Sequence, residues 1–189
     1  MYTLPVFQSF SRKTHDYGRS LVSEKKLKLI SSDFFSLLAE LVASSKNSLQ
    51  AVDFIPPSQW VKNTTIRRYG ESHRSAIGLK QRVHVFQVNS LGNNGFTKED
   101  YQRYISIMQF ANVELKFTDM LDLDKSRYET RGSVMIDNQI VGIAINPVDG
   151  APFGEINFSA EVISEYSNRF LDLFERAMTP EDFIKIFQE

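Results

Sequence analysis

The residue types best suited to chemistry in this sequence are three histidines and a few carboxylates, since the chain has no cysteine. His73 lies in a predicted helix and His84 in the strand that follows it, so the two imidazoles can approach each other. With Glu71 or Asp137 they would form a metal pair or the acid–base centre of a phosphodiesterase. We favour the simpler interpretation, in which His73 lies on a helix surface and His84 is an ordinary strand residue. We therefore expect no metal site and no cofactor.

Motifs of common nucleophile and nucleotide sites are missing from the sequence. There is no Gly-x-Ser-x-Gly, Walker sequence, Gly-x-Gly-x-x-Gly or His-Glu-x-x-His. The absence of cysteine also excludes disulfides, thiolate metal sites and cysteine nucleophiles. Gly92-Asn-Asn-Gly95 precedes a helix start and could bind phosphate through backbone amides. A strand-to-helix loop explains it equally well, and we favour the loop.

The segment from Asp53 to Trp60 is a candidate binding surface. Asp53 comes near the carboxyl end of an apolar strand, and α/β folds bind their ligands beyond this end of their strands. A carboxylate is also costly to bury without a partner. An arginine such as Arg68 would supply that partner. Trp60 is the only tryptophan and follows the rigid Pro56–Pro57 pair. It either covers the end of the sheet, which we favour, or forms the wall of a pocket.

A basic segment with aromatic neighbours extends over residues 67–84, and its composition is typical of surfaces that bind single-stranded nucleic acid. Its basic residues fall at mixed helical angles, so they need not share one face. A solvated amphipathic helix is the better interpretation. The basic residues are Arg67, Arg68, Arg74, Lys80 and Arg82.

Hydrophobic periodicity predicts the elements that position these residues. Helices are expected over about 33–45, 65–80, 97–110 and 156–177, with strands over 49–55, 82–88 and 111–117 and a hairpin over 126–146. Thr97-Lys-Glu-Asp100 is a capping box at the start of the third helix, and Thr179, followed by Pro180, caps a short final helix. Strands that alternate with helices indicate an α/β fold with a mixed, mainly parallel sheet flanked by helices on both faces. Residues 1–30 are expected to form an N-terminal arm or short helix, in which 23–29 is a solvated basic turn. Residues 31–189 are expected to form a single α/β domain.

Composition limits the classes of function. A formal charge of −1 over 189 residues gives no overall attraction to nucleic acid or to an anionic membrane. No apolar run reaches the roughly 18 residues needed to span a bilayer. The first residues have Pro5 and polar breaks where a signal peptide needs an apolar segment. We therefore expect a cytoplasmic protein with no membrane contact.

The hairpin strands GSVMID and IVGIAIN are predicted to turn at Asn138–Gln139, beside Asp137. The element order, and the helix Phe-x-x-x-Phe-x-x-Ala after the hairpin, resemble a half of the phospholipase D superfamily over about residues 31–178. Active members carry His-x-Lys, four residues and Asp in this hairpin; the histidine attacks phosphorus and the lysine neutralises phosphate oxygens. Anchoring on Asp137 places Thr130 at the histidine and Gly132 at the lysine. The resemblance therefore implies the fold and a binding surface without the chemistry.

We predict a non-catalytic, ligand-sensing or protein-interaction domain with a regulatory role. Because domains of this superfamily often pair, the resemblance implies a homodimer with the hairpin near its interface, and a regulatory protein is a second candidate partner. Two alternatives stay open, a phosphodiesterase or nuclease with an atypical site and a nucleic-acid-binding module that uses residues 67–84. The candidate ligand or interaction residues are Asp53, Trp60, Arg68, His73, Thr130 and Asp137, and none is assigned a catalytic role.

Overall fold

The structure is a computed structural model that describes residues 25–87, 91, 97–123, 132–145 and 153–188. Thr130, His15 and the Gly92–Gly95 loop lie outside these residues, as does most of the expected N-terminal arm.

The centre of the fold is a seven-stranded mixed sheet with the strand order β1-β7-β6-β5-β2-β3-β4. Only the β2–β3 and β3–β4 junctions are parallel, and the other four are antiparallel. The prediction of an α/β fold with a mixed sheet is confirmed, but the sheet is not mainly parallel. The hairpin strand β5 pairs antiparallel with β2, and two further antiparallel strands, β1 and β7, were not predicted. The strands are β1 (Lys26–Ile30), β2 (Ser48–Asp53), β3 (Leu79–Phe86), β4 (Glu114–Asp119), β5 (Ser133–Ile136), β6 (Ile140–Ile145) and β7 (Phe153–Asn157).

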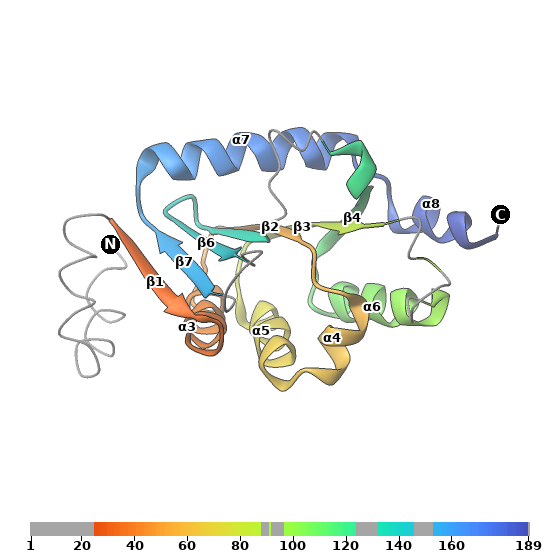
Figure 1. Ribbon diagram of the computed structural model, residues 1–189, viewed down its shortest axis with the longest axis horizontal. Coiled ribbons are helices and arrows are strands. Elements are labelled where there is room, and N and C mark those ends of the chain that lie inside the picture. Colours follow the sequence, from red (N-terminus) through yellow and green to blue (C-terminus); the bar gives the residue numbers. More distant parts are fainter. Residues whose placement is uncertain (1–24, 88–90, 92–96, 124–131, 146–152, 189) are drawn as a thin grey trace.

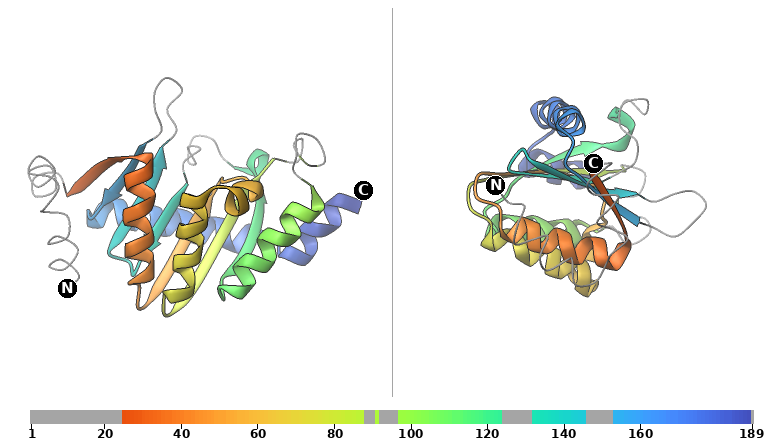
Figure 2. Two further views of the ribbon diagram at one scale, coloured as in Figure 1. Left: turned by 90° about the horizontal axis from the view of Figure 1, so that it is seen from below. Right: turned by 90° about the vertical axis from the view of Figure 1, so that its left-hand side faces the viewer.

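Helices cover both faces of this sheet, as predicted (Figure 1). One face carries α3 (Ser31–Ala43), α4 (Pro57–Lys62), α5 (Thr64–Ser75) and α6 (Lys98–Phe110). The helices α3, α5 and α6 lie side by side across the strands in Figure 2. The long helix α7 (Ala160–Arg176) crosses the opposite face, and α8 (Pro180–Lys185) follows it. Short 3-10 turns cover Met120–Asp122 and Ile186–Gln188.

Alternation along the central strands divides the side chains between these two layers. On β3, Val83 and Val85 pack under α7, in the cluster that contains Phe170 and Leu173. Arg82 and His84 point the other way, toward α5 and α6. Because both faces are covered by helices, both sets are buried. The consequence is a charged residue and a histidine in the interior of the helical layer.

Local signals explain where several helices begin. Thr97 and Asp100 form a reciprocal capping box at the start of α6, as predicted. Thr179 caps α8, with proline at its first position. Pro57 likewise opens α4, a helix that sequence periodicity did not predict because it is only six residues long.

The two unpredicted strands, β1 and β7, pair with each other at one end of the sheet. In β1, Leu27 and Leu29 are buried while Lys28 is exposed, so residues 26–30 are an amphipathic edge strand and not a solvated turn. In β7, a Cβ at Gly154 would overlap the ring of Phe34, so glycine lets α3 pack closely on the strand. The sheet therefore includes residues that precede residue 31.

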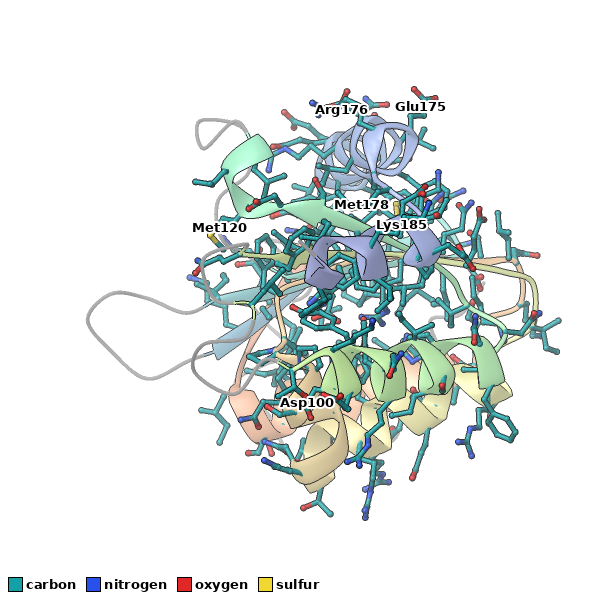
Figure 3. The ribbon with its side chains drawn as sticks, turned by 90° about the vertical axis from the view of Figure 1, so that its right-hand side faces the viewer. Asp100, Met120, Glu175, Arg176, Met178 and Lys185 are labelled. Carbon is teal, nitrogen blue, oxygen red and sulfur yellow. The ribbon has the colours of Figure 1, made fainter. Side chains whose placement is uncertain are left out.

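At the other end of the sheet, the backbone of Met178 exchanges two hydrogen bonds of 2.9 Å with Phe117 of the edge strand β4. Met178 lies between α7 and α8 (Figure 3). From α8, Phe183 stacks on Phe117 with ring centroids 4.0 Å apart. This segment covers the β4 edge.

Within the described residues, no helix is long and apolar enough to cross a membrane.

Candidate functional site

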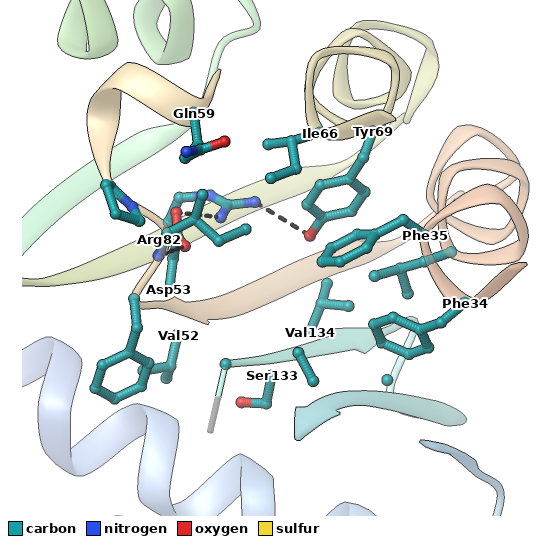
Figure 4. A pocket seen from close by; sticks show the side chains of 17 residues that line it. Phe34, Phe35, Val52, Asp53, Gln59, Ile66, Tyr69, Arg82, Ser133 and Val134 are labelled. Carbon is teal, nitrogen blue, oxygen red and sulfur yellow. Dashed lines mark hydrogen bonds and ion pairs between the residues drawn. The ribbon is translucent and has the colours of Figure 1, made fainter. Parts of the chain in front are cut away.

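A cavity of about 240 Å³ opens where β2 ends and β5 begins, next to α3 and α5 (Figure 4). Its walls are mostly apolar and include the rings of Phe34, Phe35 and Tyr69. Gly132 and Ser133 border it from the start of β5, and Gln59 borders it from α4. Among its described lining residues, the ionisable side chains are Asp53, Arg82 and the Tyr69 phenol.

Asp53 and Arg82 form a buried ion pair in which the Arg82 Nη1 donates to Asp53 Oδ2 at 3.0 Å. Each side chain is only 2% exposed. The hydroxyl of Tyr104 donates to the same carboxylate oxygen at 3.0 Å, and the amide of Ile55 donates to Oδ1 at 2.7 Å. The carboxylate thus has partners on both oxygens. We refer to Asp53, Arg82, Tyr69, His73 and Tyr104 as the polar cluster.

The second terminal nitrogen of Arg82, Nη2, contacts two residues of α5. This nitrogen donates to His73 Nε2 at 2.8 Å and to the hydroxyl of Tyr69 at 3.3 Å. His73 Nδ1 lies 3.0 Å from the backbone carbonyl of Tyr69, one helical turn earlier. Because a carbonyl can only accept, we assign the proton of a neutral His73 to Nδ1, which leaves Nε2 as the acceptor for arginine.

These contacts fix the charges of the cluster. Burial and the neighbouring Arg82 charge lower the pKa of His73 to about 3, so its ring is neutral near pH 7. Burial acts to raise the pKa of Asp53, but the nearby His84 and Arg82 more than offset it, and the pKa lies below its ordinary value. Burial and the Asp53 charge raise the pKa of Tyr104 well above its usual range. The cluster therefore holds one carboxylate and one guanidinium, with a net charge of zero.

His84 is adjacent to the polar cluster but is bound mainly by aromatic rings. Its Nδ1 lies 3.8 Å from Asp53 Oδ2, beyond hydrogen-bond distance. Its ring packs against those of Tyr101, Tyr104 and Phe117, with centroids 5.1 to 5.7 Å apart. The interpretation of His84 as an ordinary strand residue underestimates its burial, which leaves it 1% exposed.

The structure corrects two expectations in this region, for Arg68 and His73, and it excludes the pocket wall that was the less favoured interpretation of Trp60. Arg82 is the partner of Asp53, and Arg68 is exposed on α5. His73 is buried and 2% exposed, so it is not a helix-surface residue. Trp60 is 1% exposed, and its ring lies beneath the guanidinium of Arg82 and beside Tyr69, outside the lining of the cavity. It is therefore a core residue of the helical layer.

The metal pair of His73 and His84 with Glu71 or Asp137 does not fit this geometry. Both ring nitrogens of His73 contact protein groups, and Glu71 is exposed beside Arg67. Among the described residues, no group of three or more histidine or carboxylate side chains is placed to hold a metal ion.

Asp137 lies in the hairpin turn, away from the cavity. Its carboxylate accepts hydrogen bonds from the backbone amides of Lys46, Asn47 and Ser48 and from the hydroxyl of Ser45. Asp137 and Asn138 have φ of 53° and 55°, and the amide of Gln139 bonds to the carbonyl of Ile136. The turn is therefore centred on Asp137–Asn138, one residue earlier than predicted, as in a type I′ turn.

Gly132 and Asp137 flank opposite ends of β5, roughly 17 Å apart along an extended strand. Gly132 borders the cavity and Asp137 does not. Thr130 lies outside the described residues. Of Gly132 and Asp137, only Gly132, which aligns with the superfamily lysine, borders the cavity.

The basic residues of 67–84 do not form one surface. Arg82 and Lys80 are buried, and Lys80 donates to the carbonyl of His73 at 3.1 Å. Burial lowers the pKa of Lys80. Arg74 stacks over the ring of Phe110 at 4.3 Å, and Arg67 lies 3.8 Å from Glu71. Arg67, Arg68 and Arg74 stay exposed, so the segment offers three of its five basic side chains to a polyanion.

Arg82 is the residue that sequence reasoning missed, although a signal was present. The strand sequence Arg82-Val-His84-Val85 places two polar residues on one face. In a sheet covered on both sides, such a face must be buried. In the observed register, Asp53 is opposite His84 and Ala51 is opposite Arg82. An arginine on the neighbouring strand was thus a better partner for Asp53 than one on a helix.

The arrangement of sheet and helices is that of a phospholipase D-like half-domain. The phospholipase D family member Nuc from Salmonella typhimurium superposes with a TM-score of 0.52 at 11% identity, covering 82% of this chain and 96% of that chain. NucT from Helicobacter pylori gives 0.54 at 12% identity, covering 82% and 98%.

The archaeal chromatin protein TrmBL2, whose structure shows a novel mode of DNA binding, superposes with a TM-score of 0.53 at 11% identity. The match covers 92% of this chain, which spans 65% of the length of that protein. The sequence matches no protein-family model and no curated protein. At these identities the likeness establishes the fold alone.

Proposed function

We propose that this chain is a non-catalytic, ligand-binding domain with a regulatory role, in which a small-molecule pocket stands where the phospholipase D superfamily has its phosphodiesterase site. The observation that carries the proposal is the cavity beside Gly132. The sequence alignment assigns Gly132 to the lysine position, and the Asp53–Arg82 pair that borders the cavity is buried and already neutralised.

Phosphodiester cleavage needs a nucleophile and a cation for the phosphate oxygens. His73 accepts a hydrogen bond from Arg82 through Nε2, and His84 is enclosed by aromatic rings. Neither borders the cavity within the described residues. The two terminal nitrogens of Arg82 are bound to Asp53, Tyr69 and His73, so a phosphate would have to displace internal partners to bind them.

The similarity to a DNA-binding chromatin protein makes nucleic acid the second ligand class to consider. The buried positions of Lys80 and Arg82 argue against it, because they remove two of the five basic residues from the proposed surface. An apolar cavity favours a small molecule.

The proposal is tested first by a hydrolysis assay on bis(4-nitrophenyl) phosphate, with and without divalent cations, from pH 5 to 9. We expect no turnover above the buffer rate. Turnover that disappears in His73→Gln or His84→Gln would establish an atypical phosphodiesterase instead.

Binding is tested with a fluorescent single-stranded oligonucleotide at rising salt. Phosphate contacts weaken steeply with salt, so tight binding at 50 mM that is lost at 200 mM would favour the nucleic-acid alternative. We expect no such binding. Self-association stays a prediction, and sedimentation velocity over a range of protein concentrations measures it directly.

A further inference from the structure

We propose that the cavity beside Gly132 selects small, uncharged, planar aromatic molecules that carry one hydrogen-bonding group such as a carboxamide, and rejects their anionic counterparts. This inference rests on the proposed function, since it names the ligand class of the same pocket. It follows from the shape, the charge and the polar rim of the cavity.

The aromatic wall is continuous. Phe34 and Phe35 from α3 meet edge to face with ring centroids 5.2 Å apart, and Phe35 is 5.9 Å from Tyr69 of α5. All three rings line the cavity and appear together in Figure 4. Aromatic rings prefer offset or edge-to-face contacts with another ring, so a flat aromatic ligand is complementary to this wall.

Size sets an upper limit on the ligand. Pockets for drug-sized molecules usually have volumes of about 300–1,000 Å³. A cavity of about 240 Å³ lies just below that range and suits a ligand of one or two rings.

Charge decides between neutral and ionised ligands. Asp53 and Arg82 neutralise each other's charge at 3.0 Å, and each side chain is only 2% exposed. A buried anionic ligand would therefore lose its hydration without gaining a free cation among the described lining residues, and an unpaired buried charge is costly. A neutral ligand avoids this cost.

Two polar side chains remain for the hydrogen-bonding group. Gln59 from α4 is exposed, and Ser133 from β5 is partly exposed; both border the cavity. They lie on different sides of the pocket in Figure 4. An amide and a hydroxyl both donate and accept, so either can bind a carboxamide without a change of charge.

Gly132 gives a way to change the charge of the cavity at one position. A Cβ there would lie 3.5 Å from the carbonyl oxygen of Val52 and 3.9 Å from the Cβ of Ala144, which are ordinary contacts. Gly132→Lys therefore introduces a cation at the border of the cavity. Gly132→Met adds a side chain of similar length without charge and is the matched control.

The experiment compares 2-naphthamide with 2-naphthoate, which have nearly the same shape and differ in charge at pH 7.5. Dissociation constants are measured by protein-observed NMR titration on the full chain. We expect the amide to bind at least about tenfold more tightly than the carboxylate, which corresponds to about 1.4 kcal/mol. Gly132→Met should weaken both ligands, and Gly132→Lys should shift the preference toward the carboxylate. Gln102→Leu, at an exposed position on α6, should change neither.

The outcomes separate the two proposals. If neither compound binds the native chain at millimolar concentration, the pocket is not a ligand site and the proposed function fails. If the carboxylate binds as tightly as the amide, the pocket binds ligands but the inferred selectivity is wrong. The comparison on the native chain decides both points even if one variant does not fold.

Discussion

Replacing Arg82 with methionine should strongly destabilise the fold. The change removes the guanidinium that neutralises Asp53 and leaves the Tyr104 hydroxyl and the Ile55 amide as the hydrogen-bond donors to the carboxylate. It also leaves His73 Nε2 without the arginine N–H that donates to it. Breaking one partner of a buried ion pair typically costs 3–5 kcal/mol. For a domain with a total stability of roughly 5–15 kcal/mol, this is a large share.

A double-mutant cycle separates the ion pair from general damage to the core. Asp53→Asn alone should cost a similar amount because it leaves a buried arginine charge without its counterion. In Asp53→Asn/Arg82→Met both charges are absent, so the double variant should be more stable than the sum of the two losses predicts. We expect an interaction energy of about 2–3 kcal/mol.

Urea unfolding at pH 7 provides the assay, monitored by far-UV circular dichroism and by the fluorescence of Trp60, the only tryptophan. Arg67→Met is the control, because that arginine is exposed beside Glu71. Its effect should stay within about 0.5 kcal/mol. A loss below about 1 kcal/mol for Arg82→Met, or strict additivity in the cycle, would refute the reasoning.

Three further predictions follow from single sites. Gly154→Ala should cost about 1–3 kcal/mol, because its Cβ would overlap Phe34, whereas Gly132→Ala should cost much less; equal melting temperatures would contradict this. Asp137→Ala should cost at least about 2 kcal/mol by chemical denaturation, and Asp137→Asn less, because asparagine keeps one acceptor and tolerates a positive φ; the reverse order would count against the turn assignment. The pKa of His73 is about 3 in the folded chain and 6.5 in a model peptide, so the unfolded state binds the extra proton between these values. Stability should fall by up to about 1.4 kcal/mol per pH unit as the pH drops from 6.5 toward 4.5, and a His73→Gln variant with the same slope would show that another group is responsible.

Local patterns predicted those parts of the fold that depend on neighbouring residues. The capping box at Thr97, the proline-led α8 and the amphipathic α7 were predicted because the necessary residues lie within a few positions of one another. The strands β1 and β7 were missed, since each is five residues long and is stabilised mainly by pairing. The sequence of either segment alone gives little indication that it pairs with a strand more than a hundred residues away.

The candidate site shows the same division. Asp53 was predicted to need an arginine partner, and that expectation follows from the cost of burying a carboxylate wherever it lies. The choice of Arg82 instead of Arg68 depends on the register of β2 against β3, and on α5 covering that face of β3. The environment of Trp60 likewise depends on how α4 packs against α5 and α6.

The sequence by itself determined the class of fold, the hairpin around Asp137 and the absence of a His-x-Lys pair, because these are properties of residue type and spacing. Only the tertiary structure decided that Gly132 borders a cavity, that Asp137 instead binds the backbone of residues 46–48, and that His73 is a neutral acceptor for Arg82. The physical reason is that burial and charge compensation belong to the space between elements. Asp53 meets its counterion Arg82 only when β2 pairs with β3, and Gly132 borders a cavity only when α3, α4 and α5 pack on the sheet.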